Sequence, residues 1–136
     1  MWQIAIKPGK PLAFGAVKNE NNKESWFIGL PGNPVSSFVT FLLCVQPFIC
    51  ALQGRKNKPQ QSYLMRADFD WKKSDKRNEF LRVKVNEQGG LDLFPNQGSG
   101  VLTSAVWGDG LLDNPPMTMI NKGDLVKFIP FSSILI

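Results

Sequence analysis

The stretch "FIGLPGNPVSSFVTF" at residues 27–41 decides the fold, because it joins an apolar, strand-like run to a strongly apolar, helix-like run. Asn33 is a favoured N-cap residue, and Pro34 suits the first helical position, where no backbone N–H is needed. The sequence therefore predicts a helix that begins at about Pro34. Its first turn presents unpaired N–H groups and the hydroxyl of Ser36, while Gly32 lets a ligand approach the backbone closely. This pattern is typical either of an ordinary strand-to-helix turn or of an anion site.

The charge balance narrows the class of partner without choosing among them. Sixteen Lys and Arg against eleven Asp and Glu give a net charge of +5, which favours a phosphate, another oxyanion, a nucleic acid or a membrane surface. No secretory signal pattern opens the chain, so we expect a cytoplasmic protein. The chain has no histidine to complete a metal set, and we interpret Cys44 and Cys50 as buried packing thiols.

The apolar run at residues 35–52 continues the predicted helix. Ser36, Thr40 and Pro47 interrupt it, and a membrane span needs about twenty mostly apolar residues. We therefore expect a buried helix with a kink at Pro47, and no membrane partner. Three short strands, which are all that the preceding residues predict, are too few to cover so apolar a helix. We expect another chain, or the first part of a larger α/β domain, to cover it.

The chain divides into two unlike parts. Residues 1–54 predict strands, turns and one helix, and residues 55–61, "RKNKPQQ", form a polar and basic linker. Residues 62–136 predict strands only, with alternating apolar and polar positions and short turns, which is typical of a compact β-barrel or sandwich. The predicted fold class is α+β: the C-terminal piece of an α/β domain followed by a small all-β, barrel-like domain.

A second motif, "KPGKP" at residues 7–11, favours the anion site over the ordinary turn. Pro8 fixes one backbone dihedral and Gly9 allows a positive φ, so the turn holds Lys7 and Lys10 near each other. Two ammonium groups held close are unfavourable unless an anion lies between them. Alone, the turn is more typical of a solvated hairpin. If the strands before this turn and before the helix are parallel neighbours, however, both turns open at one edge of a sheet, where α/β domains bind ligands.

The second part of the chain adds weaker candidates. Arg77 and Arg82 lie in "KRNEFLRV", and Ser99 lies in "NQGSG". Arginine offers a planar fork that suits phosphate or another oxyanion, and a Gly-Ser-Gly loop presents backbone donors to one. Without other support each is more typical of a solvated strand or of a hairpin loop.

Taken in order, the segments "IKPGKPLAFG", "GLPGNPVSSFVTF", "RNEFLR", "NQGSG" and "KGDLVKFIP" resemble the C-terminal part of the molybdopterin molybdenumtransferases. This is the MoeA family, to which the gephyrin E domain and the plant Cnx E domain are related. The resemblance implies that residues 1–54 are the end of a MogA-like α/β domain and that residues 62–136 are the family's C-terminal β-barrel-like domain. It implies a transferase that inserts molybdate into adenylylated molybdopterin and releases AMP.

The resemblance also implies roles for single residues, although it identifies no catalytic residue. It assigns the molybdate or anion site to Lys7, Lys10, Ser36 and Arg77. It places nine further residues near the molybdopterin or AMP: Pro8, Gly9, Pro11, Pro31, Gly32, Asn33, Pro34, Arg82 and Ser99. It implies Mg²⁺ as a cofactor, molybdate and adenylylated molybdopterin as substrates, a homodimer, contact with other molybdenum cofactor biosynthesis proteins, and no nucleic-acid partner.

Three departures from the family pattern limit what the chain can do by itself. The family's acidic metal-binding motif lies upstream of "PGKP" and has no counterpart here, so we expect no metal site in this chain. Lys76 stands where many members have glycine, which leaves the register of Arg77 open, and Asp109 replaces a small residue. We expect a fragment or truncated product that is inactive alone.

Two other functions stay open. The first is a non-catalytic anion-binding or scaffold module of the same fold. The second is a nucleic-acid-binding β-barrel, which requires stacking aromatic residues among the basic ones. Phe69, Trp71 and Phe80 are the candidates for that role, and they are equally typical of core residues.

Overall fold

The computed structural model describes residues 2–56 and 58–134. Residues 1, 57 and 135–136, which fall in the three predicted parts, lie outside the described residues. The first part contains β1 (Trp2–Gln3), β2 (Ile6–Lys7), β3 (Pro11–Lys18), β4 (Glu24–Gly29), α1 (Pro34–Thr40), the π-helical turn η1 (Phe41–Val45) and α2 (Gln46–Leu52). The second contains β5 (Tyr63–Arg66), β6 (Asn78–Val85), β7 (Leu91–Leu93), α3 (Thr103–Trp107), β8 (Gly110–Asn114), β9 (Leu125–Pro130) and α4 (Phe131–Ile134). This mixture of strands with few helices confirms the predicted α+β class.

The second part is organised around one sheet in the order β2-β6-β8-β9-β5, with β7 beside β6. All neighbouring strands run antiparallel except β2, which pairs in parallel with the start of β6. One face of the sheet encloses a core that includes Leu81, Val83, Leu112 and Phe128. The parallel β2–β6 pair joins the first residues of the chain to the second part. No local sequence pattern predicts this contact.

The opposite face of the same sheet is covered by helix α1. Val35, Val39 and Leu42 have no exposed surface, and they pack in one cluster with Phe80 of β6 and Leu111 of β8. The spacing i, i+4, i+7 places the three helical residues on one stripe. Strand β6 is therefore buried on both faces, and its five consecutive residues 79–83 are all buried, the charged Glu79 and Arg82 included. The expectation that this chain cannot cover the helix is wrong for α1, because the sheet covers it.

The second half of the helix is different. Pro47 has no N–H to donate to the carbonyl four residues earlier, and the turn immediately before it widens, so that the N–H of Gln46 bonds to the carbonyl of Phe41. Helix α2 buries none of its residues fully, and Ile49 and Leu52 are exposed. By length and composition alone Pro34–Leu52 is apolar enough to cross a membrane, but its first half packs against the sheet.

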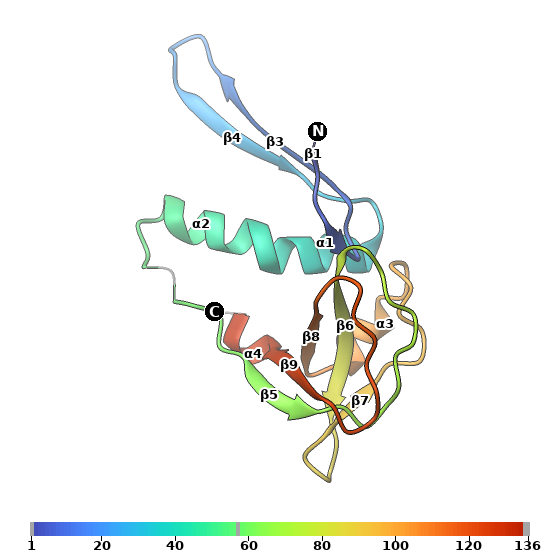
Figure 1. Ribbon diagram of the computed structural model, residues 1–136. Helices are drawn as coiled ribbons and strands as arrows, with labels where there is room; N and C mark the ends of the chain where they lie inside the picture. The colour runs from blue at the N-terminus through green and yellow to red at the C-terminus, as the bar shows by residue number, and fades with distance from the viewer. Residues whose placement is uncertain (1, 57, 135–136) are drawn as a thin grey trace.

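Strands β3 and β4 form a long antiparallel hairpin that extends away from the sheet of the second part (Figure 1). The hairpin turn is fixed by Asn19, whose side-chain oxygen accepts hydrogen bonds from the N–H groups of Asn21 and Lys23. The hairpin contacts α2 through the rings of Phe14, Trp26 and Phe48, whose centroids lie 5.3–6.1 Å apart. The condition that the strands before the two turns are parallel neighbours is not met, since β2 pairs with β6 and β4 pairs with β3 in a different sheet. The division into domains at residues 55–61 stays a prediction.

Candidate anion site

A cleft of about 320 Å³ brings together three segments that are far apart in the sequence. They are the turn at residues 7–11, the helix start at residues 31–36 and the loop at residues 97–99, with Arg77 between them. All four residues predicted to bind an anion line this cleft, namely Lys7, Lys10, Ser36 and Arg77. Seven of the nine predicted neighbours also line it: Pro8, Gly9, Pro11, Pro31, Gly32, Asn33 and Ser99. Pro34 and Arg82 are not among its lining residues.

The "KPGKP" turn lies directly on helix α1. Gly9 has φ +114°, and a Cβ atom at this position would lie 2.5 Å from Oγ1 of Thr40 and 3.5 Å from the carbonyl oxygen of Ser36. The predicted positive φ at Gly9 is therefore confirmed, and the close approach gives a second reason for glycine. The peptide bond between Lys7 and Pro8 is cis. This contact, rather than a shared sheet edge, brings Lys7 and Lys10 beside the start of the helix.

The helix begins at Pro34, as predicted. Asn33 is extended, with φ −73° and ψ 134°, but its side chain does not cap the helix. Its amide instead donates a hydrogen bond to the hydroxyl of Ser99 (3.0 Å), and the N–H of Val35 donates to the carbonyl of Ser99 (3.0 Å). Asn33 therefore joins the helix start to the "NQGSG" loop.

This arrangement changes which first-turn groups can face a ligand. The N–H of Val35 is bonded to Ser99, and that of Ser37 is donated to the carbonyl of Asn33 (2.9 Å). Proline at position 34 has no N–H. Among the residues that the structure describes, Ser36 is the first-turn residue whose N–H and hydroxyl are not already donated. Ser36 is 4% exposed and borders the cleft, so it is the donor that the helix start offers to an anion.

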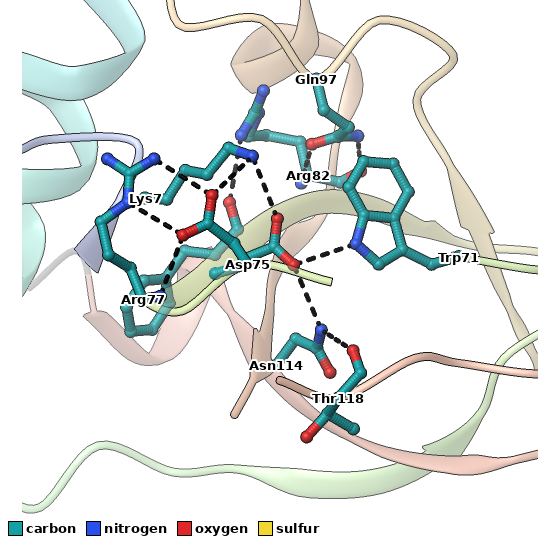
Figure 2. A network of polar contacts seen from close by, with 10 residues as sticks. Lys7, Trp71, Asp75, Arg77, Arg82, Gln97, Asn114 and Thr118 are labelled. Atoms are coloured by element: carbon teal, nitrogen blue, oxygen red, sulfur yellow. Dashed lines mark hydrogen bonds and ion pairs between the residues drawn. The ribbon is translucent and has the colours of Figure 1, made fainter. Parts of the chain in front are cut away.

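Two of the three predicted cations are already paired with carboxylates. Lys7 Nζ lies 3.2 Å from Oδ2 of Asp75 and 3.4 Å from Oε2 of Glu79. Arg77 donates hydrogen bonds to the Asp75 carboxylate from Nε (3.0 Å) and from a terminal nitrogen (3.1 Å). Its backbone N–H donates to the same carboxylate (2.9 Å). Figure 2 shows Lys7 and Arg77 converging on Asp75. Lys10 is exposed and has no ion pair with any residue in the described ranges.

These contacts favour the ionised form of the Asp75 carboxyl. The hydrogen bonds from Arg77, followed by that from Lys7, hold the pKa of the Asp75 carboxyl well below its usual range. The carboxylate is therefore ionised throughout the neutral range. A fixed negative charge therefore lies beside the cleft, in contact with two of the predicted cations that line it.

Glu79 fixes Lys7 from the side of the sheet. Its side chain is 1% exposed, and its Oε1 accepts hydrogen bonds from Nε1 of Trp71 (3.0 Å) and the amide of Asn114 (3.4 Å). Asn114 in turn donates to the carbonyl of Thr118 (2.9 Å), and Figure 2 shows this chain of contacts. Oε2 accepts no hydrogen bond from the described residues and forms the ion pair with Lys7, so this buried carboxylate positions the ammonium of Lys7 at the edge of the cleft.

Arg82 has a different role from the one expected. It is 1% exposed and donates to the hydroxyl of Ser104 (3.0 Å), to the carbonyl of Phe80 (3.0 Å) and to that of Gly98 (3.4 Å). Burial lowers the pKa of Arg82 to about 10, which still leaves it charged at neutral pH. Gln97 binds both the N–H and the carbonyl of Arg82 at 3.0 Å. The two side chains hold the "NQGSG" loop, and with it Ser99, against strand β6.

The aromatic residues considered for nucleic-acid stacking lie in the core. Phe80 is buried beneath α1, Phe69 packs against the core of the second part, and Trp71 is half-buried with its indole N–H bonded to Glu79. The free cysteines Cys44 and Cys50 are half-buried. Within residues 2–56 and 58–134 no group of three His, Cys, Asp or Glu side chains is placed to hold a metal ion.

Sequence reasoning missed Asp75 and Glu79, which contact the predicted cations directly. A signal for them exists, because Asp75, Arg77 and Glu79 alternate at the entry to strand β6. Residues two apart in extended backbone point to the same side. The pattern Asp-x-Arg-x-Glu thus predicts three charged groups on one face.

Known proteins resemble this chain in sequence and in structure. A protein-family model described as "MoeA C-terminal region (domain IV)" matches residues 65–131. The molybdopterin molybdenumtransferase of Haemophilus influenzae is 39% identical, over 98% of this chain and 33% of its own length. The molybdenum cofactor synthesis protein cinnamon of Drosophila melanogaster is 38% identical, over 85% of this chain and 19% of its own. The chain thus spans about a third or less of the length of these relatives.

Two solved structures share the fold. A molybdenum cofactor biosynthesis protein from Pyrococcus furiosus superposes with a TM-score of 0.75 at 24% identity, over 95% of this chain and 44% of that one. The molybdopterin biosynthesis MoeA protein from Pyrococcus horikoshii gives a TM-score of 0.74 at 24% identity, over 96% and 31%. Both superpositions cover the hairpin, the helix and the sheet together, since they span almost the whole chain.

Proposed function

This chain belongs to the MoeA family of molybdopterin molybdenumtransferases, of which it corresponds to the C-terminal portion, and from this membership we propose its function. It supplies the oxyanion-binding part of a transferase that inserts molybdate into adenylylated molybdopterin with release of AMP. The observation that carries the proposal is the single cleft lined by Lys7, Lys10, Ser36 and Arg77. The two halves of the chain contribute to it jointly.

The residues of the cleft suit a tetrahedral oxyanion. Lys10 adds an ammonium with no ion pair among the described residues, and the fork of Arg77, which Asp75 occupies in the structure, suits two oxygens of one anion. Ser36 offers its hydroxyl and N–H from a buried position, and Ser99 lies opposite on a loop that Asn33 ties to the helix. Ser36, which is buried and fixed before the anion arrives, stabilises it without the cost of reorganisation. These groups bind and orient molybdate for transfer.

The remaining parts of the reaction are proposed to need residues outside this chain. The described residues do not fit a Mg²⁺ site, so no step in the chemistry is assigned to that ion here. We propose that Mg²⁺ is held elsewhere in the complete enzyme, which works in the cytoplasm as a homodimer and contacts other proteins of molybdenum cofactor synthesis. Release of AMP from adenylylated molybdopterin by these 136 residues alone would contradict this division of roles.

Titration of the purified chain with molybdate tests the proposal. We expect saturable binding that weakens by about 10- to 100-fold in Lys7→Ala and in Ser36→Ala, because each removes a hydrogen bond to a charged group. Lys18→Ala, at the exposed end of the hairpin, is the matched control and should bind like the wild type. Isothermal titration calorimetry measures all four proteins.

The alternative function predicts a different result. A scaffold module needs no oxyanion, and exposed apolar side chains such as Trp26, Phe27 and Leu52 offer a surface for protein contacts. Absence of saturable molybdate binding, or equal binding by the wild type and both cleft variants, would favour that module over the transferase.

A further inference from the structure

Asp75 lies between two of the cations that line the anion cleft. Its carboxylate contacts Lys7 Nζ at 3.2 Å and the side chain of Arg77 at 3.0 and 3.1 Å. An oxyanion that binds to Lys7 and to the Nε edge of the Arg77 guanidinium needs N–H groups that Asp75 already occupies. Ligand and carboxylate therefore compete for one set of donors.

The Asp75 side chain has a second space beside it into which it can turn. Asp75 borders a neighbouring hollow of about 650 Å³, which Lys10, Ser74, Lys76 and Arg77 line with it. Lys10 and Arg77 border both spaces. A rotation of the Asp75 side chain toward Lys76 would release Lys7 and Arg77 while the carboxylate stays close to positive charge.

Charge decides which ligands can displace Asp75. The carboxylate carries one negative charge and already has good hydrogen-bond geometry, so a monoanion of similar reach gains little by replacing it. A tetrahedral dianion brings a second charge and more acceptor oxygens to the same donors. Because the pKa of Asp75 is held well below its usual range, the carboxylate is not removed by protonation near neutral pH.

We propose that Asp75 is an internal competitor that makes the cleft selective for tetrahedral dianions over monoanions. The inference rests on the proposed anion cleft and adds to it the residue that sets its charge selectivity. Asp75 stays in contact with Lys7 and Arg77 until a dianion takes its place. A cleft without this carboxylate would bind either charge class.

A second Asp–Arg pair in the chain provides a matched control. Arg66 and Asp68 have the same spacing as Asp75 and Arg77, a bidentate contact (2.6 and 3.1 Å) and the same 19% side-chain exposure of the aspartate. This pair lies outside the anion cleft. Neutralising either aspartate changes the net charge by the same amount, so only an effect specific to the cleft can separate the two variants.

The experiment titrates the full chain with molybdate, a dianion, and with perrhenate, a tetrahedral monoanion, by calorimetry at neutral pH. The wild type should bind molybdate at least about 100-fold more tightly than perrhenate. Asp75→Asn should bind perrhenate at least about tenfold more tightly than the wild type does, so that the ratio of molybdate affinity to perrhenate affinity falls. Asp68→Asn and Asp75→Glu, which leave a carboxylate at position 75, should keep the wild-type ratio.

The outcomes separate this inference from the proposed function. An unchanged ratio in Asp75→Asn, or weaker binding of both anions, would overturn the inference while the wild-type affinity for molybdate upholds the proposed function. No molybdate binding by the wild type would overturn both. Asp75→Ser provides a second neutral variant, with folding checked by circular dichroism. If neither neutral variant folds, Asp75 is a structural residue and the inference is wrong.

Discussion

Gly9→Ala is expected to lower the free energy of unfolding by about 3 kcal/mol and to abolish molybdate binding. A positive φ of +114° is strained for alanine, which costs about 1–3 kcal/mol. The new Cβ would also lie 2.5 Å from Oγ1 of Thr40, a fully buried side chain, and overpacking of this kind costs about 1–3 kcal/mol. Lifting the turn off helix α1 would separate Lys7 and Lys10 from Ser36.

Urea denaturation followed by circular dichroism measures the effect, with Gly32→Ala as the control. Gly32 borders the same cleft, but a Cβ there meets no atom within 4 Å and its φ is ordinary. Its substitution should change stability by less than about 1 kcal/mol. Adding Thr40→Ala to Gly9→Ala should recover the steric part of the loss and not the backbone part. Equal losses in Gly9→Ala and Gly32→Ala would contradict the role given to the close approach.

Arg82→Ala should be at least as destabilising, with a loss of about 3–5 kcal/mol. The substitution removes three donated hydrogen bonds and leaves a cavity where a fully buried side chain stood. The buried carbonyl of Phe80 loses this donor, and an unsatisfied buried group costs about 1–3 kcal/mol, to which the cavity adds its own cost. The carbonyl of Gly98 keeps the N–H of Val101 (3.3 Å) but loses its tie to β6. Thermal unfolding and molybdate titration should both report the loss, because the released loop carries Ser99.

The matched control is Arg66→Ala. Arg66 is exposed and bound to Asp68 on the surface, and exposed ion pairs contribute about 0–1 kcal/mol. If Arg82→Ala proves as mild as Arg66→Ala, the "NQGSG" loop is held by other contacts. If Arg82→Ala unfolds the protein, Arg82→Met, which keeps the volume of the side chain, should remain folded and still bind molybdate more weakly.

Local chemistry made part of the fold predictable. The helix start at Pro34 and the positive φ at Gly9 follow from the residue types at single positions, and both are confirmed. The pairing of β2 with β6 joins residues about seventy apart, and nothing in either segment encodes that partner. The same is true of Val35 and Val39, which looked uncovered because the sheet that buries them lies in the other half of the chain.

The residues that line the candidate site could be predicted from the sequence, but the carboxylates that pair with them could not. The motifs that bring Lys7, Lys10, Ser36 and Arg77 into one cleft follow from the family resemblance. Their ion-pair partners depend on side-chain directions at the entry to β6, which place Asp75 beside Lys7 only after the strands have paired. Hydrogen-bond roles shifted for the same reason: Asn33 donates across to Ser99 instead of capping its own helix.

Crystals of this chain grown with molybdate, with diffraction recorded at the molybdenum absorption edge, locate the metal atom directly. We predict one dominant anomalous peak inside the cleft, bordered by Lys7, Lys10, Ser36 and Arg77. A cleft without a peak at saturating molybdate would contradict the proposed site. So would a peak in the basic hollow beside α2, which Arg55, Lys56 and Lys58 border.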